Sequence, residues 1–216
     1  RRGIPVIEDA AQSFGASYKG RKSCNLSTIA CASFFPSKPL GCYGDGGAIF
    51  TNDDALAETL RCIVNHGQKK RYEHCMIGIN GRLDTVQAAV LRVKLRHFDA
   101  EIAARQKVAA WYTESLRDLV GTPFVEAHNL SVWAQYTVRV PNRDAVIQRL
   151  QAKGIPTAIH YPIPLHRQEV FRPLGIADAE CPVSCRLAAE VFSLPMHPFL
   201  KEDEVRHIAR GVVESL

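Results

Sequence analysis

One lysine of this chain, Lys38, stands in a setting where its amine can take part in chemistry. The surrounding segment, 33–41, is apolar or built of small residues, and it leads into four glycines between positions 41 and 47. Removal from water lowers the pKa of a lysine, and the neutral amine is a nucleophile able to form Schiff bases. Lys38 is therefore the candidate covalent residue, against the alternative of an ordinary surface lysine.

A carboxylate at a strand end is the second candidate group. Asp9 closes an apolar run at 6–9 that predicts a strand. Ligands of open α/β sheets bind beyond the carboxyl ends of strands, where a carboxylate can pair with a cationic group of a cofactor. Capping of a turn or helix is the other role open to Asp9. Ser33 and Lys38 lie near the end of a second apolar run, at 28–35.

Composition and motif searches exclude several classes of protein. The net charge of the chain is +5. Its lysines and arginines are spread out along the sequence except at 69–71, which we interpret as a solvated loop. We therefore expect no nucleic-acid partner. No apolar run approaches the roughly 20 residues that cross a bilayer, and there is no signal peptide. The seven cysteines lack paired CxxC spacing, which predicts reduced thiols in the cytoplasm and no metal site. Without a P-loop or GxGxxG pattern, the glycines are weak evidence of a nucleotide site.

The elements that must position these groups follow from periodicity and turn signals. Strands are predicted at 6–9, 28–35, 46–51, 133–140, 157–161 and 192–194, and helices at 52–65, 84–116, 142–153, 185–191 and 202–216. The long helical region is expected to bend near Asp99 and to contain a domain boundary. We predict an α/β fold with domains at 1–105 and 106–216.

Five motifs carry a resemblance to a known family. They are Val-Ile-Glu-Asp-Ala-Ala-Gln at 6–12, Ser-Phe-Phe-Pro-Ser-Lys at 33–38, Gly-Asp-Gly-Gly at 44–47, Asn-Gly-Arg-Leu-Asp at 80–84 and His-Tyr-Pro-Ile-Pro-Leu-His at 160–166. In order and spacing they resemble the DegT family of fold-type I, pyridoxal-phosphate-dependent nucleotide-sugar aminotransferases over essentially the whole chain. The resemblance is closest to the WbpE-type branch. It implies part of a large mixed-sheet α/β domain followed by a smaller α/β C-terminal domain.

The resemblance also implies roles for residues near a pyridoxal 5'-phosphate cofactor. Lys38 would be the Schiff-base lysine and would move the substrate proton. Asp9 would keep the pyridine nitrogen protonated. Gln12 would contact the ring or its 3-hydroxyl, and Ser33 would bond a phosphate oxygen. Ordinary strand-end hydrogen bonding is the alternative for Gln12 and Ser33.

Further residues would complete the site across a homodimer. Asn80 would reach the cofactor phosphate of the neighbouring subunit, with a turn or cap role as the alternative. Arg82, His160 and Tyr161 would lie near substrate, where a guanidinium suits a carboxylate of glutamate or of a sugar acid. His160 and Tyr161 could instead be structural.

The implied reaction transfers an amino group from L-glutamate to a UDP-2-acetamido-3-keto-hexuronic acid for O-antigen synthesis. A pyridoxal-phosphate-dependent sugar dehydratase is an alternative, although such relatives carry histidine at the position of Lys38. A catalytically incompetent fragment or a non-enzymatic homologue is another. The family's phosphate-cradling helix and stacking aromatic residue would precede Arg1, so we expect the full-length parent to be active and this chain alone to be inactive.

Overall fold

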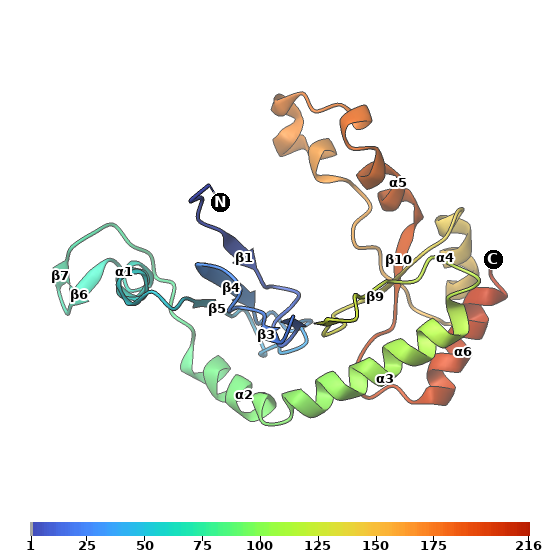
Figure 1. The fold of residues 1–216 in the computed structure, drawn as a ribbon, viewed down its shortest axis with the longest axis horizontal. Coiled ribbons are helices and arrows are strands. Elements are labelled where there is room, and N and C mark those ends of the chain that lie inside the picture. The colour runs from blue at the N-terminus through green and yellow to red at the C-terminus, as the bar shows by residue number, and fades with distance from the viewer. Residues whose placement is uncertain (1) are drawn as a thin grey trace. The chain divides into compact units, whose positions relative to one another are not determined.

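Three strands form the central sheet of the first part of the chain, in the order β1–β4–β5 (Figure 1). Strand β1 (Ile7–Asp9) runs parallel to β4 (Ile29–Ser33), and β5 (Gly47–Phe50) is antiparallel to β4. Asp9 pairs with Cys31, and Ser33 pairs with Gly47. The carboxyl ends of β1 and β4 and the start of β5 therefore meet at one edge of a mixed sheet.

A smaller sheet lies beside this one in sequence and has the order β3–β2–β8. Its hairpin joins β2 (Ser17–Tyr18) to β3 (Arg21–Lys22) through Lys19 and Gly20, which both have positive φ. Two-residue turns of this kind match the right-handed twist of the strands. Strand β8 (Asn129–Leu130) pairs with β2 although it lies more than 100 residues away in the chain.

Helices of the first part begin and end at recognisable signals. In α1 (Asp54–Val64) the side chain of Asp53 accepts a hydrogen bond from the Leu56 amide at 3.0 Å, as an N-cap does. The hairpin of β6 (Gln68–Lys70) and β7 (Glu73–His74) follows. The predicted long helix is divided into α2 (Thr85–Leu95) and α3 (Phe98–Leu116), with the break at 96–97.

An aromatic core holds the lysine-bearing loop in place. Phe14 packs its ring against Phe34, Phe50 and Phe98 at centroid distances of 5.6 to 5.9 Å. The buried members of this core come from β4, the following loop, α2, α3 and residue 132: Ala32, Phe34, Leu40, Cys42, Leu91, Phe98, Ile102 and Val132. Burial of each large apolar side chain contributes about 1.5–3 kcal/mol.

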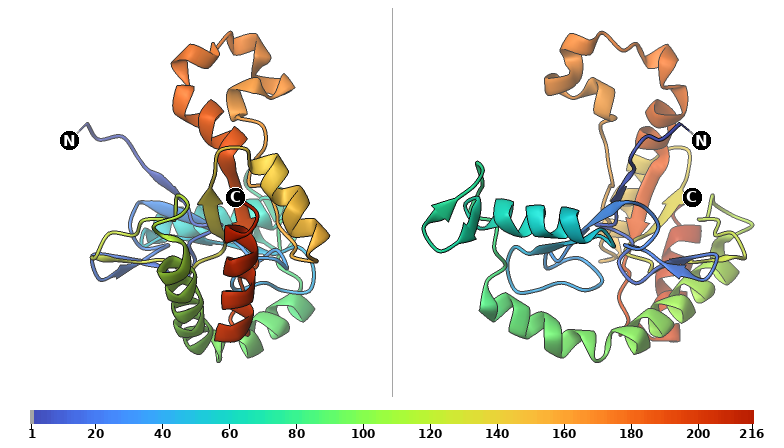
Figure 2. Two further views of the ribbon diagram at one scale, coloured as in Figure 1. Left: turned by 90° about the vertical axis from the view of Figure 1, so that its right-hand side faces the viewer. Right: turned by 60° about the vertical axis from the view of Figure 1, so that its left-hand side comes forward.

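The later part of the chain has its own sheet and core. Strand β9 (Tyr136–Arg139) is antiparallel to β10 (Val191–Leu194). Between them lie α4 (Arg143–Ala152), three short 3-10 turns η1 (Leu165–Arg167), η2 (Glu169–Leu174) and η3 (Asp178–Glu180), and α5 (Pro182–Glu190). Helix α6 (Glu202–Val213) ends the chain and lies beside the later turns of α3 (Figures 1 and 2).

Buried tyrosines anchor this second core. Tyr112 and Tyr136 stack at 4.9 Å between ring centroids. The Tyr112 hydroxyl donates to the Pro195 carbonyl at 2.9 Å, and the Tyr136 hydroxyl lies 2.7 Å from the Thr113 hydroxyl. Burial raises the pKa of both phenols. These contacts tie α3 to β9 and to the segment after β10.

A computed structural model describes residues 2–216, which divide into two compact units. The first comprises residues up to Ala103 together with Val125–Ala134, and the second comprises Ala104–Phe124 and Gln135–Leu216. The strand predicted at 157–161 is wrong as a regular element, since the pairing there is a single bridge between Ala158 and Ser193. In the part of the chain described, no helix combines the length and the apolar character that a membrane span requires.

Candidate active site

Asp9 and the turn after it occupy the carboxyl edge of the central sheet. The Asp9 side chain is exposed, and its Oδ1 accepts a hydrogen bond from the Ala11 amide at 3.1 Å. Within residues 2–216 this carboxylate forms no other hydrogen bond or ion pair. The turn-capping role is therefore real, and it leaves Oδ2 open. Gln12 is exposed in the same turn.

Ser33 lies on the same edge, because β4 runs parallel to β1. Its Oγ accepts a hydrogen bond from the Phe35 amide at 3.2 Å. The hydroxyl proton remains available for an acceptor such as a phosphate oxygen. Ser33 is the last residue of β4 and pairs with Gly47 at the start of β5.

The loop that carries Lys38 is closed at its base by backbone hydrogen bonds. The Phe34 amide donates to the Gly46 carbonyl at 2.8 Å, and the Cys42 amide donates to the Phe34 carbonyl at 2.8 Å. The Cys42 thiol also donates to the Phe34 carbonyl, at 2.9 Å. Lys94 adds a hydrogen bond from Nζ to the carbonyl of Gly41. This closure fixes the path of the backbone on both sides of Lys38.

Lys38 itself is half-buried, and its neighbours Pro39 and Leu40 are buried. Its amide donates to the Phe35 carbonyl at 2.9 Å. The ammonium group forms no ion pair or hydrogen bond with the residues between 2 and 216. An amine that no carboxylate holds is free to react with a ligand at the carboxyl edge of the sheet.

Asn80 and Arg82 are positioned by the end of α1. The backbone of Asn80 bridges to Asn65, and the Gly81 amide donates to the Val64 carbonyl at 2.8 Å. The Arg82 guanidinium donates to Asn65 Oδ1 at 2.9 Å. The Asn80 side chain is exposed. The backbone of Asn80 therefore takes part in the turn, and among residues 2–216 its side-chain amide has no hydrogen-bond partner.

His160 and Tyr161 belong to the second unit. His160 Nδ1 lies 2.9 Å from the hydroxyl of the buried Ser193. The Tyr161 ring is exposed and meets the His160 ring edge-on at 5.5 Å. Both line a groove of about 910 Å³ whose other walls are mainly apolar, including Ile163 and Phe171. His160 is thus tied to the sheet, while Tyr161 faces outward.

The mixed sheet, with a lysine-bearing loop at its carboxyl edge, has the mixed α/β fold of the fold-type I aminotransferases. The model of the DegT/DnrJ/EryC1/StrS aminotransferase family matches residues 1–213. The chain therefore belongs to this family, which confirms both the resemblance and the fold class expected from the sequence.

Two curated relatives are similar over nearly all of this chain. A UDP-2-acetamido-2-deoxy-3-oxo-D-glucuronate aminotransferase of Pseudomonas aeruginosa is 61% identical over 213 residues, covering 97% of this chain and 58% of the relative. A UDP-N-acetyl-3-dehydro-alpha-D-glucosamine 3-aminotransferase of Acidithiobacillus ferrooxidans is 42% identical over 217 residues, covering 100% of this chain and 58% of the relative.

Solved structures are similar over the same extent. A DegT DnrJ EryC1 StrS aminotransferase from Brucella abortus has a TM-score of 0.94 at 45% identity, with 98% of this chain and 57% of that chain covered. DesV of S. venezuelae, in complex with a ketimine intermediate, has a TM-score of 0.96 at 40% identity, with 99% and 58% covered. The chain thus spans a little under three fifths of the length of these relatives.

Proposed function

We propose that the protein containing these residues transfers an amino group from L-glutamate to a keto-sugar nucleotide. The observation that carries the proposal is Lys38, held in a closed loop at the carboxyl edge of the sheet, with no carboxylate of residues 2–216 on its ammonium group. The relative that is 61% identical supports UDP-2-acetamido-3-keto-hexuronic acid as the acceptor. The product would enter the synthesis of a surface polysaccharide such as an O-antigen.

The groups on this sheet edge fit pyridoxal 5'-phosphate. An unpaired amine, a carboxylate with one open oxygen and a serine hydroxyl lie on elements that end at one edge: Lys38, Asp9 and Ser33. When bound, this cofactor supplies an aldehyde that captures amines and a ring that accepts electrons. We propose that Lys38 attaches to it and carries a proton to and from the substrate carbon.

The neighbouring residues would hold the cofactor in register. The negative charge of Asp9 would keep a proton on the ring nitrogen through the open Oδ2. The Ser33 hydroxyl would donate to the phosphate, and Gln12, in the turn beyond Asp9, would contact the ring or its 3-hydroxyl. The lysine at position 38, in place of the histidine of related sugar dehydratases, favours amino transfer over dehydration.

Arg82 is the best candidate for holding a substrate carboxylate. Its guanidinium now donates to a neutral amide, that of Asn65. A carboxylate accepts two charge-assisted hydrogen bonds from the same fork, so it would displace the amide. His160 and Tyr161 would also contact substrate.

We further propose a homodimer in which Asn80 reaches the cofactor phosphate of the other subunit. Support comes from the segment before Asn80, where Tyr72, Ile77 and Ile79 are exposed by 77%, 99% and 61%. Large apolar side chains gathered on one protruding segment are typical of a protein interface. Mixing Lys38→Ala chains with Asn80→Ala chains tests this, because the mixed dimer has one complete site. Activity should return on mixing if the sites are shared, and it should stay absent if they are not.

Two further proposals concern organisation. The unit with Lys38 would be part of the large cofactor-binding domain and the other the small C-terminal domain, with the predicted division at 105/106 falling inside α3. Residues 1–216 alone would be inactive; support for this proposal comes from Ile7, which lies on the edge strand β1 of the described sheet and is 70% exposed. The seven free cysteines support a reducing cytoplasm.

The test is glutamate-dependent amination of a panel of UDP-keto-sugars by the protein containing these residues. The 3-keto-hexuronic acid should react fastest, and Lys38→Ala should abolish both turnover and borohydride-fixed labelling by pyridoxal phosphate. Turnover by Lys38→Ala at the parent rate would refute the proposal. Turnover by residues 1–216 alone would refute only the incompleteness of the pocket.

A further inference from the structure

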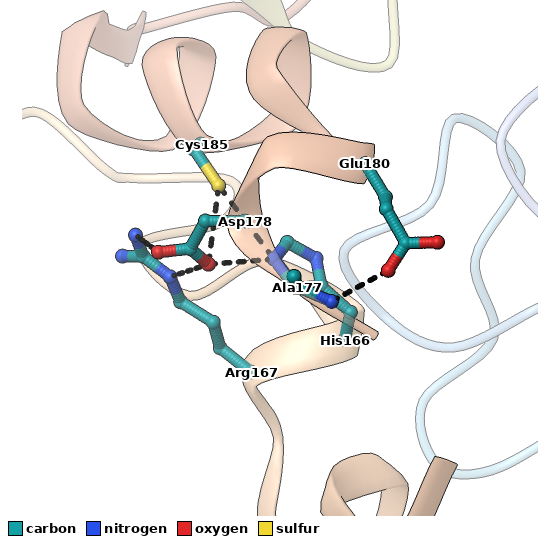
Figure 3. A network of polar contacts seen from close by, with 6 residues as sticks. All are labelled: His166, Arg167, Ala177, Asp178, Glu180 and Cys185. Carbon is teal, nitrogen blue, oxygen red and sulfur yellow. Dashed lines mark hydrogen bonds and ion pairs between the residues drawn. The ribbon is translucent and has the colours of Figure 1, made fainter. Parts of the chain in front are cut away.

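A histidine, an aspartate and a cysteine converge in the second unit (Figure 3). His166 comes from η1, Asp178 from η3 and Cys185 from α5. His166 Nε2 lies 3.0 Å from Asp178 Oδ1, and Cys185 Sγ lies 3.6 Å from each of those two atoms. The three ligand atoms thus form a small triangle.

This geometry does not suit a nucleophilic triad. In a cysteine–histidine–aspartate relay, the thiol and the carboxylate contact opposite nitrogens of the imidazole. Here both Cys185 and Asp178 approach the same nitrogen, Nε2 of His166. A neutral imidazole nitrogen offers either one proton or one lone pair, so it cannot serve both groups well. Convergence on one point is what a shared ion requires.

Two of the three separations match the edges of a tetrahedral coordination shell, and the third is shorter. Zinc bonds of about 2.0–2.1 Å to nitrogen, 2.0–2.2 Å to oxygen and 2.3 Å to sulfur at tetrahedral angles place sulfur roughly 3.6 Å from each of the other atoms, and nitrogen roughly 3.4 Å from oxygen. The structure has 3.6, 3.6 and 3.0 Å. The ion would fit if the distance between His166 Nε2 and Asp178 Oδ1 increased by about 0.4 Å.

Arg167 orients the Asp178 carboxylate, and the cluster remains accessible from solvent. Arg167 grips Asp178 with two hydrogen bonds, Nε to Oδ1 at 2.9 Å and Nη2 to Oδ2 at 2.7 Å. Figure 3 shows Arg167 and His166 on different sides of the aspartate. The His166 side chain is 6% exposed, whereas that of Asp178 is 57% exposed. The cluster is therefore anchored on its inner side and open to solvent on its outer side.

We propose that His166, Asp178 and Cys185 bind a zinc ion, with water as the fourth ligand. Nitrogen, oxygen and thiolate donors together select a borderline metal such as zinc over magnesium or calcium. The thiol proton of Cys185 passes to solvent when the ion binds. No metal was expected from the sequence, since the three residues are 12 and 7 positions apart and follow no ligand-spacing pattern.

The ion would cross-link the segment from η1 to α5, whose 3-10 turns bury few side chains. The turns η1, η2 and η3 contain no buried residue. Residues of the same segment, Leu165, His166, Phe171 and Ile176, line the groove beside His160 and Tyr161. A cross-link from η1 through η3 to α5 would hold this wall of the groove in place.

Cobalt chloride and zinc chloride, added singly to the reduced, metal-free protein that contains these residues, test the proposal. The parent should take up one equivalent of cobalt with a thiolate-to-cobalt band in the near ultraviolet. Cys185→Ser should lose that band and bind zinc more weakly by calorimetry, by more than the roughly 10- to 100-fold that loss of an outer-shell partner costs. Cys181→Ser is the matched control, since Cys181 lies four residues away in the same region but outside the cluster, and it should behave as the parent.

The outcomes separate cleanly. Zinc should raise the melting temperature of the parent and of Cys181→Ser but not that of Cys185→Ser, and circular dichroism without metal checks that all three fold alike. Zinc affinity unchanged in Cys185→Ser, an equal loss in Cys181→Ser, or no stoichiometric uptake by the parent would each overturn the site. Activity plays no part in these readouts, so they are independent of the proposed amino transfer.

Discussion

Gly41 closes the loop that carries Lys38, and a single added methyl group there has no room. A Cβ at Gly41 would lie 2.6 Å from the Pro36 carbonyl oxygen, 2.7 Å from that of Phe35 and 2.9 Å from the Pro36 carbonyl carbon. All three are backbone atoms, so no side-chain rotation relieves the contact. The Phe35 carbonyl also accepts the Lys38 amide, and relief must therefore move Lys38.

The magnitude follows from the shortfall in distance. Ordinary contact begins at 3.4 Å, so the Pro36 carbonyl must retreat by about 0.8 Å in Gly41→Ala. Overpacking of this kind costs about 1–3 kcal/mol of folding free energy. Displacement of a reacting group by about 1 Å costs on the order of 100-fold in rate. We expect both effects, because the strained loop is also the one that aims the amine.

Gly44→Ala is the matched control in the same glycine-rich link. Its Cβ would meet the Gln87 amide nitrogen at 2.9 Å, which is the end of a flexible side chain and can move aside. Urea unfolding measures stability, and borohydride-fixed labelling by pyridoxal phosphate measures the reactivity of Lys38. If Gly41→Ala unfolds and labels as Gly44→Ala does, the loop is looser than the structure indicates and the reasoning fails.

Three other predictions test separate parts of the molecule. Asp9→Asn should keep the turn hydrogen bond to Ala11 but lose the charge, so labelling of Lys38 should persist while turnover falls by about 100-fold or more; equal turnover would refute the role of Asp9. Arg82→Lys should raise KM for the carboxylate-bearing substrate about tenfold and leave labelling unchanged, since a lysine lacks the bidentate fork; a fall in kcat alone would contradict this. Burial raises the pKa of Tyr112 and Tyr136 in the folded state, so above a pH of about 10 these tyrosines ionise in the unfolded chain before they do in the folded one. The free energy of unfolding should therefore fall as the pH rises above about 10, by up to about 1.4 kcal/mol per pH unit for each tyrosine. Tyr112→Phe should reduce this slope in urea unfolding, and an unchanged slope would show that Tyr112 does not contribute to it.

Local sequence patterns predicted most elements because the forces that set them are local. The apolar run that ends at Asp9 and the helix capped by Asp53 depend on residues within a few positions of each other. The break of the long helix at 96–97 was placed only roughly, since periodicity continues through it. The strand at 157–161 failed because only Ala158 pairs, with Ser193, and a local pattern does not reveal whether a partner strand runs alongside.

Some features of the candidate site were likewise predicted from the sequence, and others were visible only in the structure. Residue type and motif singled out Lys38, Asp9 and Ser33, and parallel pairing of β1 and β4 then places their strand ends on one edge. Their chemical roles stay predictions. The pairing of Arg82 with Asn65 and of His160 with Ser193 had no signal in the sequence, because partners 17 and 33 residues away are chosen by packing.

The sequence by itself determined the α/β class and the family and singled out Lys38 as the candidate covalent residue, since these rest on residue identity and on order along the chain. Only the tertiary structure decided how tightly Gly41 closes the lysine loop and that His166, Asp178 and Cys185 converge within 3.6 Å of one another. The physical reason is the same in both cases. Close approach of groups distant in the chain is settled by packing and hydrogen bonding in three dimensions, which no local pattern encodes.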